Sequence, residues 1–264
     1  MAEMTLIGKG MTSEIFSLDD GKVLKLYYAE CGPEMAEHEA RISQSINGTG
    51  VAPGYHGKMQ HNGRIGLIYD RISGYELMAD FMKPFAPLSG IVKKMAGELY
   101  AINCVVPPET LIRQKDRLRH MIGQSEGALG GLCVKVTERL SSLDTQSFLC
   151  HGDYHPGNIM CSGGEYVAID WMNAYAGNPL SDAVRTWLMF ASPFIPNGVP
   201  PLLKPLLKAV KPFMANTFRN EYLRISKEKK RAFEKWIPVM AAARLIENIP
   251  GEKEWLFDLI KRYL

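Results

Sequence analysis

The apolar residues of this 264-residue chain change their spacing near Tyr75. Up to that point, short stretches with strand-like alternation are separated by turn residues, as in TLIGKG, EIFSL and KVLKLY and in the pair GYHGKM and RIGLIYD around an Asn-Gly turn. One helical segment interrupts them, beginning near Pro33 and ending near Gly48. Beyond Tyr75 the apolar residues recur at helical spacing. The pattern predicts an α+β chain with a small β-rich lobe over residues 1–72 and a larger helical lobe over residues 73–264.

Six helices are predicted in the second part, over residues 88–103, 111–124, 129–143, 202–223, 227–249 and 252–264. The longest uncharged run, Thr186 to Leu203, contains four prolines, so we expect a loop between helices there and not a membrane span. The first ten residues lack the basic and then apolar pattern of a secretory leader. We therefore expect a cytoplasmic protein with no membrane partner.

Charge and cysteine content narrow the class of protein. The chain carries 31 basic and 28 acidic residues, and this near balance excludes a nucleic-acid binder driven by overall charge. Its five cysteines are scattered and form no CxxC pair, so neither a disulfide framework nor a structural zinc site is expected. The sequence gives no indication of the oligomeric state.

The segments FLCHGDYHPGNIM and YVAIDW carry the clearest chemical signal. An apolar strand is predicted to end at His151, Gly152 allows a tight turn, and Asp153 begins an exposed loop. Asn158 follows, before a hairpin with an SGGE turn. Folding this hairpin about its turn brings Asp170 opposite Asn158 to within one residue, at a Cα separation of about 5 Å. Carboxylate and amide oxygens are ligands suited to Mg²⁺.

Two other interpretations of this segment are weaker. It could be a polar loop with no chemical role. The pattern His151-x-Asp153-x-His155 could also be a transition-metal cluster, but no further His–Asp cluster in the sequence completes such a site. His151 by itself is predicted to be a packed residue whose imidazole supports the loop.

A second group of candidate residues lies near the N-terminus. Gly8, Gly10 and Ser13 form a glycine-containing turn between two strands, and the backbone N–H groups of such a turn can approach phosphate oxygens. Taken alone, this turn is equally typical of an ordinary hairpin. Lys25 follows on a short strand, with its side chain on the opposite face from its neighbours, which could also describe a solvated edge lysine.

The helix that follows favours a functional role for this lysine. Met35, Glu39, Ile42 and Ile46 share one face of the helix, so Glu39 lies in the apolar stripe whereas Glu37 does not. A carboxylate on a buried face needs a charged partner. An ion pair between Lys25 and Glu39 is therefore predicted.

Together, these motifs resemble those of the aminoglycoside phosphotransferase and choline-kinase-like family, which are small-molecule kinases with a bilobal protein-kinase-like fold. The resemblance covers nearly the whole chain and is most specific in HGDYHPGNIM and IDW. The stretch AYAGNPLSDAVR is also similar to the family's segment after its metal-binding aspartate. It implies an enzyme that uses ATP, or GTP, with Mg²⁺ to phosphorylate a hydroxyl group of a small molecule.

The resemblance also implies roles for individual residues. Asp153 would be the catalytic base, and His155 would lie near the γ-phosphate. Asn158 and Asp170 would hold Mg²⁺. On the cofactor side, the resemblance implies that the loop Gly8–Gly10–Ser13 covers the triphosphate, that Lys25 paired with Glu39 contacts it, and that the backbone at Asp70 and Ile72 binds adenine. Asp182 would be structural and bond the loop or a helix start.

Some alternatives stay open at this stage. There is no room for an activation loop between Asp170 and Asp182, which argues against a protein kinase. A pseudokinase or nucleotide-binding scaffold remains the second interpretation, although every catalytic position carries the expected residue type. The acceptor is also open among aminoglycosides, choline or ethanolamine, sugars and similar alcohols, because neither the interleaved charges of the last helices nor the tryptophans select one.

Overall fold

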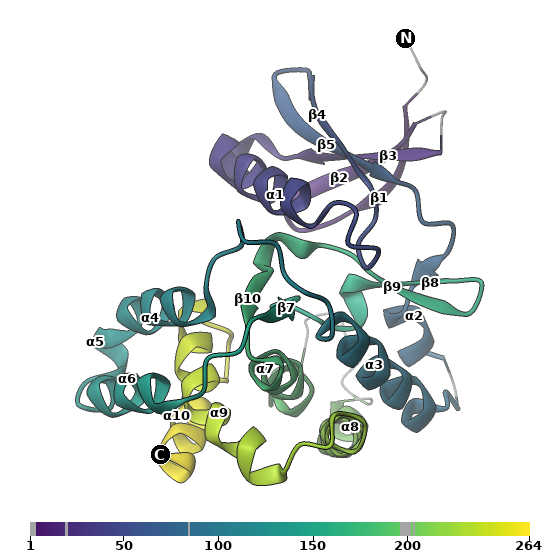
Figure 1. The fold of residues 1–264 in the computed structure, drawn as a ribbon. Coiled ribbons are helices and arrows are strands. Elements are labelled where there is room, and N and C mark those ends of the chain that lie inside the picture. The colour runs from purple at the N-terminus through teal and green to yellow at the C-terminus, as the bar shows by residue number, and fades with distance from the viewer. Residues whose placement is uncertain (1–3, 19–20, 84, 196–201, 203) are drawn as a thin grey trace. The chain divides into compact units, whose positions relative to one another are not determined.

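Figure 1 presents a computed structural model of the chain, which describes residues 4–18, 21–83, 85–195, 202 and 204–264. The chain forms two compact units, one of Met1–Met82 with Pro156–Ala174 and one of Lys83–His155 with Tyr175–Leu264. The predicted α+β class is confirmed. The units do not follow the boundary predicted at residue 72, because residues 156–174 belong to the same unit as the N-terminal strands and their hairpin pairs with Tyr75–Glu76. The assignment of residues 1–72 and 73–264 as functional lobes stays a prediction.

The first unit is built on an antiparallel sheet in the order β1-β2-β3-β5-β4. Its strands are β1 (Thr5–Lys9), β2 (Ser13–Ser17), β3 (Lys22–Tyr27), β4 (Tyr55–His61) and β5 (Arg64–Asp70). A 3-10 turn η1 (Ala29–Cys31) leads into helix α1 (Gly32–Ile46). Its buried face packs on the sheet around Ala36, Ala40 and Leu67. The strands and the helix predicted from turn signals and periodicity are confirmed.

A smaller sheet completes this unit. It has the order β6-β8-β9 and consists of β6 (Tyr75–Glu76), β8 (Ile159–Ser162) and β9 (Glu165–Ala168). Short helices α2 (Met78–Phe81), η2 (Pro156–Asn158) and η3 (Trp171–Asn173) flank it. Ile159 pairs with Ala168, so the predicted hairpin register is confirmed. Gly74, just before β6, runs so close to this sheet that an added Cβ would lie 2.0 Å from the carbonyl oxygen of Cys161.

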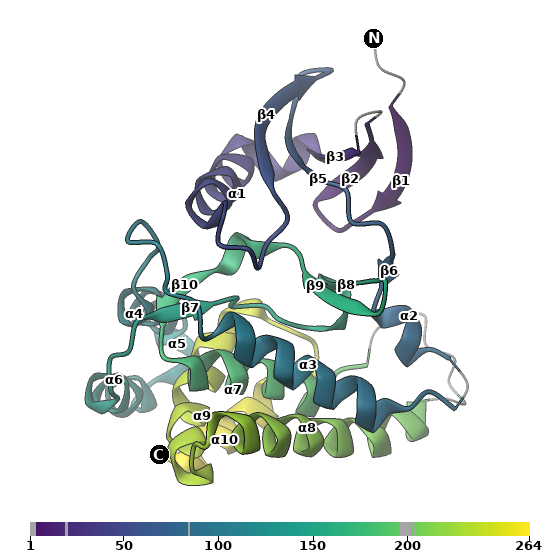
Figure 2. The ribbon, with the colours of Figure 1, turned by 45° about the vertical axis from the view of Figure 1, so that its right-hand side comes forward.

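The second unit is mostly helical. Its elements are α3 (Leu88–Ile102), α4 (Gln114–Gln124), α5 (Glu126–Leu129), α6 (Leu132–Ser142), α7 (Pro179–Ala191), α8 (Lys204–Ser226), α9 (Lys230–Arg244), η5 (Leu245–Glu247) and α10 (Lys253–Tyr263), with the strand pair β7 (Phe148–Cys150) and β10 (Tyr175–Gly177). The six predicted helices are present with shifted ends. Figures 1 and 2 show that α7 is enclosed by α3, α8 and α9.

A loop was predicted over Thr186 to Leu203. This prediction is wrong for residues 186–191, because they form the last part of α7. The side chain of Asn178 accepts a hydrogen bond from the N–H of Leu180 at 2.9 Å and so caps this helix. Residues 186–191 are uncharged because the helix is buried on nearly all sides there, and not because they form a loop. Residues 196–201 and 203 of this stretch lie outside the described residues. In the part of the chain that is described, no helix has the length and apolar character needed to cross a membrane.

Candidate active site

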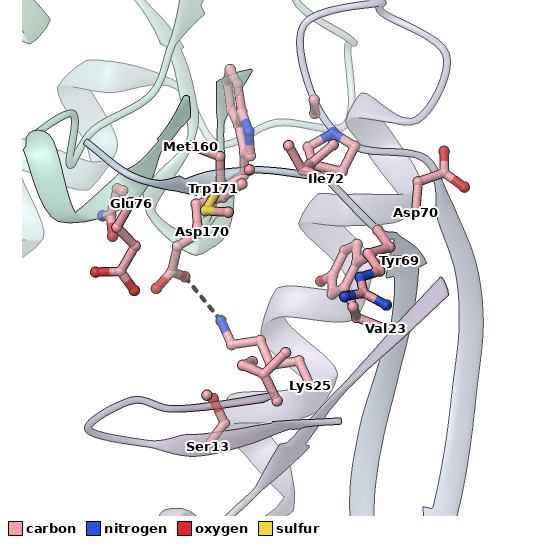
Figure 3. Close-up of a pocket in the computed structure, with 18 of the residues that line it drawn as sticks. Ser13, Val23, Lys25, Tyr69, Asp70, Ile72, Glu76, Met160, Asp170 and Trp171 are labelled. Atoms are coloured by element: carbon pink, nitrogen blue, oxygen red, sulfur yellow. Dashed lines mark hydrogen bonds and ion pairs between the residues drawn. The ribbon is translucent and has the colours of Figure 1, made fainter. Parts of the chain in front are cut away.

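The first unit contains a pocket of about 780 Å³ (Figure 3). Strands β1, β2 and β3 form one side of it, the segment after β5 forms another, and the β8–β9 hairpin closes it. Apolar side chains such as Ile15, Val23 and Ile72 alternate with the charged groups of Lys25 and Asp170 along its lining. A pocket of this size with a few convergent polar groups is typical of a ligand site.

Lys25 is the centre of the charged groups. Its ammonium lies 2.9 and 2.8 Å from the two carboxylate oxygens of Glu39 and 3.1 Å from Oδ1 of Asp170. Burial lowers the pKa of Lys25, but the two carboxylates outweigh burial and hold the pKa above its ordinary value. The predicted pair with Glu39 is confirmed. Glu37 instead bonds Lys58 on the surface at 2.7 Å.

Two tyrosines that were not predicted also hold Glu39. The hydroxyl of Tyr27 donates to Oε2 of Glu39, and the hydroxyl of Tyr69 lies 2.9 Å from Oε1. Ser43 contacts the Tyr69 hydroxyl at 2.8 Å. Burial first, and then the charge of Glu39, raises the pKa of both tyrosines, so both phenols stay protonated donors. The position of Tyr27 two residues after Lys25, on the same face of β3, was the signal that could have indicated it.

We expect Glu39→Ala to lower the free energy of unfolding by about 3–5 kcal/mol, because it leaves the ammonium of Lys25 without its main buried partner. The apparent affinity for nucleotide should fall at the same time. Chemical denaturation checks the first effect and calorimetry the second. The matched control is Glu37→Ala in the same helix, which removes only a surface pair and should change little. Equal effects of the two substitutions would contradict the role given to Glu39.

The β8–β9 hairpin positions the two predicted metal ligands. The N–H of Ile169 donates to the carbonyl oxygen of Asn158 at 2.9 Å, so Asn158 and Asp170 lie at the open end of the hairpin. Asp170 has a left-handed backbone with φ of 60°, and Figure 3 shows its carboxylate facing Lys25 across the pocket. Both residues line the pocket, and their oxygens fit Mg²⁺.

Not every residue that was predicted to contact the nucleotide lines the pocket. Gly8 and Ser13 line the pocket, whereas Gly10 lies outside the lining and donates to the carbonyl oxygen of Ser13 at 2.8 Å within the β1–β2 turn. Asp70 and Ile72 line it as well.

Asp70 is largely engaged elsewhere. Its N–H donates to the carbonyl oxygen of Gly54 at 2.9 Å, and its carboxylate lies 2.6 Å from Nε2 of His56. Figure 3 shows this carboxylate directed away from Lys25 and Asp170. Any contact of Asp70 with adenine would therefore have to use its carbonyl oxygen.

Asp153 belongs to the second unit, in the loop after β7. Its Oδ1 accepts a hydrogen bond from Nη2 of Arg185 at 2.9 Å, and Nε2 of His155 lies 3.8 Å from its Oδ2. Burial raises the pKa of Asp153, but Arg185 and then His155 outweigh burial, so the carboxyl has a lowered pKa. Because Asn158 and Asp170 lie in the first unit, the meeting of all three side chains stays a prediction.

Buried polar residues fix the shape of this loop. The carboxylate of Asp182 accepts the N–H groups of His151 and Gly152, both at 2.8 Å, which confirms the prediction that Asp182 bonds the loop. Asn103, which was not predicted, donates to Oδ2 of Asp182 at 3.1 Å. His151 is fully buried and its Nδ1 accepts the N–H of Asp153 at 3.2 Å, in agreement with the predicted supporting role.

A family model described as the phosphotransferase enzyme family matches residues 3–209 of the sequence. The chain belongs to the phosphotransferase enzyme family. This confirms the predicted kind of enzyme, a transferase of the kinase type. A comparison with curated proteins gave no match.

Solved structures similar to this phosphotransferase show the same fold at low identity. The apo form of a thermostable variant of aminoglycoside phosphotransferase APH(4)-Ia is 15% identical, with a TM-score of 0.61 over 99% of this chain and 94% of that one. A ternary complex of such a variant with AMP-PNP and hygromycin B is also 15% identical, with a TM-score of 0.62 over 99% of this chain and 92% of that one. Aminoglycoside-3′-phosphotransferase of type VIII is 14% identical, with a TM-score of 0.60 over 100% of this chain and 94% of that one. The predicted protein-kinase-like fold is confirmed.

Proposed function

We propose that this phosphotransferase moves the γ-phosphoryl group of ATP to a hydroxyl group of a small polar molecule. The observation that carries the proposal is the buried ammonium of Lys25, held between Glu39 and Asp170 in the wall of a pocket large enough for a nucleotide. Such transfers depend on positioning and on neutralising phosphate charge more than on covalent chemistry. Similar structures bound to AMP-PNP or ADP support nucleotide use here.

The residues have distinct roles in this proposal. Lys25 binds the α- and β-phosphates, and the turn Gly8–Ser13 covers them. Asn158 and Asp170 hold Mg²⁺, which when bound supplies positive charge to the phosphates. Asp153 accepts the proton of the acceptor hydroxyl. Its lowered pKa keeps the carboxylate charged, so it acts by orienting the hydroxyl as well as by taking its proton. His155 assists near the γ-phosphate.

The proposed acceptor is an alcohol, and aminoglycosides are the first class to test because hygromycin B and streptomycin occupy similar solved structures. Choline, ethanolamine and sugars are the other acceptors that the sequence leaves open. We propose residues 1–72 as the nucleotide lobe, residues 73–264 as the acceptor lobe, and a cytoplasmic location.

A coupled ADP-release assay tests this function. The purified chain with ATP and Mg²⁺, or with GTP, is offered aminoglycosides, choline, ethanolamine, homoserine, methylthioribose and thiamine in turn. We expect one class to raise ADP release above the slow hydrolysis seen without acceptor, and both rates to fall in Asp153→Asn. A chain that binds ATP in calorimetry but releases no ADP, with or without acceptor, would instead be a pseudokinase.

A further inference from the structure

A chain of alternating charges, with buried arginines between the carboxylates, starts at Asp153 in the second unit. Arg185 on α7 is only 6% exposed, and its guanidinium bonds Asp153 through Nη2 and Glu247 of η5 through Nη1. Glu247 is bonded in turn by Nη1 of Arg244 at 3.0 Å. Arg244 also forms two hydrogen bonds with Glu252, at 2.7 and 2.9 Å. Carboxylates and guanidiniums therefore alternate from Asp153 to the segment before α10.

The burial of Arg185 is not explained by a gain in stability. It is the only charged residue in α7 besides Asp182, and burying a guanidinium costs several kcal/mol that ion pairs seldom exceed. Its Nε is buried and finds no hydrogen-bond partner in the part of the chain that the structure describes. What the arrangement does provide is a rigid fork that joins Asp153 to Glu247.

We propose that Arg185, held in place by Glu247, is a positioning residue that fixes the carboxylate of Asp153 for phosphoryl transfer. The inference rests on the proposed function, in which Asp153 orients the acceptor hydroxyl. A misplacement of about 1 Å at such a group can cost about 100-fold in rate. Glu247 lies beyond residue 209, where the family match ends, so the C-terminal helices contribute to the geometry of the catalytic loop.

The charges around Asp153 set the direction of a pH effect. Arg185 faces it from α7, and His155 and His151 face it from its own loop. On the far side of Arg185 lies Glu247, while Asp182 bonds the backbone of the loop. Arg185 stabilises the charged form of Asp153. Removing Arg185 should therefore raise the pKa of Asp153 and move the acid limb of kcat/KM to higher pH, by about one pH unit.

The test compares variants along this chain of charges. For Arg185→Met we expect kcat to fall by about 10- to 100-fold with the shifted acid limb. The affinity for AMP-PNP should not change, because the nucleotide pocket is lined by the first unit. Arg185→Lys keeps the charge but not the fork, and should recover the pH profile better than the rate. Glu247→Gln should lower kcat by less than Arg185→Met does, without moving the acid limb to higher pH, because Arg185 keeps its charge beside Asp153.

The control is Glu252→Gln, which removes the charge beyond Arg244 and leaves the contacts of Glu247 with Arg185 and Arg244 in place. It should change the melting temperature without moving the acid limb. An acid limb that moves equally in the control, or a folded Arg185→Met variant with unchanged kcat and pH profile, overturns the proposal.

A readout independent of turnover separates this inference from the proposed function. Titration of the Asp153 carboxyl by NMR, with carbon-13 in the aspartate side chains, should show a higher pKa in Arg185→Met than in the parent chain. If the parent chain releases no ADP, the proposed function fails, and the positioning role in catalysis fails with it. If the parent chain is active and the Asp153 titration is unchanged in Arg185→Met, only the role of Arg185 fails.

Discussion

Asp153→Asn is expected to lower kcat by about 10²- to 10⁴-fold, the range for loss of a general base. An amide cannot accept the proton of an alcohol, although it fills the same space. Arg185 keeps its bond to Glu247 in this variant, so the loop should stay folded. Steady-state kinetics with the best acceptor measures the effect. Calorimetry with AMP-PNP should give an unchanged affinity, because the proposed nucleotide pocket is lined by residues of the other unit.

The matched control is Asp258→Asn, on the exposed side of α10, which should leave kcat unaltered. Turnover that survives in the Asp153 variant would remove this residue from the mechanism. A loss of kcat together with a collapse of the melting temperature would point to the loop's structure and not to its chemistry.

The second large effect is expected for Asp170→Asn, with a loss of about 100-fold in the affinity for nucleotide measured with Mg²⁺. The substitution removes a charged oxygen that lies 3.1 Å from the ammonium of Lys25 and one of the two proposed Mg²⁺ ligands. Asparagine is chosen because it tolerates the left-handed backbone at this position, where alanine would add strain.

Calorimetry with and without EDTA checks this result. In the parent chain, EDTA should weaken nucleotide binding strongly, and in Asp170→Asn it should make little further difference. Glu165→Gln, at the start of β9 in the same hairpin, serves as the control for a change of net charge. If Mg²⁺-dependent affinity is equal in the parent and in Asp170→Asn, the residue is not a metal ligand.

Local signals predicted those parts of the site that depend on neighbours in the sequence. The SGGE turn fixed the register between Asn158 and Asp170, and the helical stripe selected Glu39 over Glu37. Their accuracy has a physical reason, since a tight turn determines cross-strand pairs and a buried carboxylate requires a partner.

The residues that were missed owe their roles to partners far along the chain. Arg185 bonds Asp153 across 32 positions and Glu247 across 62, and no pattern near Arg185 indicates either partner. Asn103 reaches Asp182 across 79 positions. Helix α7 was not predicted, for a related reason. An uncharged run with prolines is typical of loops, and only the surrounding helices reveal that its first part is buried.

The ammonium group and the two hydroxyl groups that bond Glu39 also restrain the motion of α1. This helix is tied to β3 by Lys25 and Tyr27, to β5 by Tyr69, and to η3 by the contact of His38 with the carbonyl oxygen of Met172 at 3.0 Å. For the helix to swing outward, all of these bonds would have to break together. In the proposed function, an incoming triphosphate would therefore meet an ammonium that is already held in place, and no activating event would have to turn the helix first.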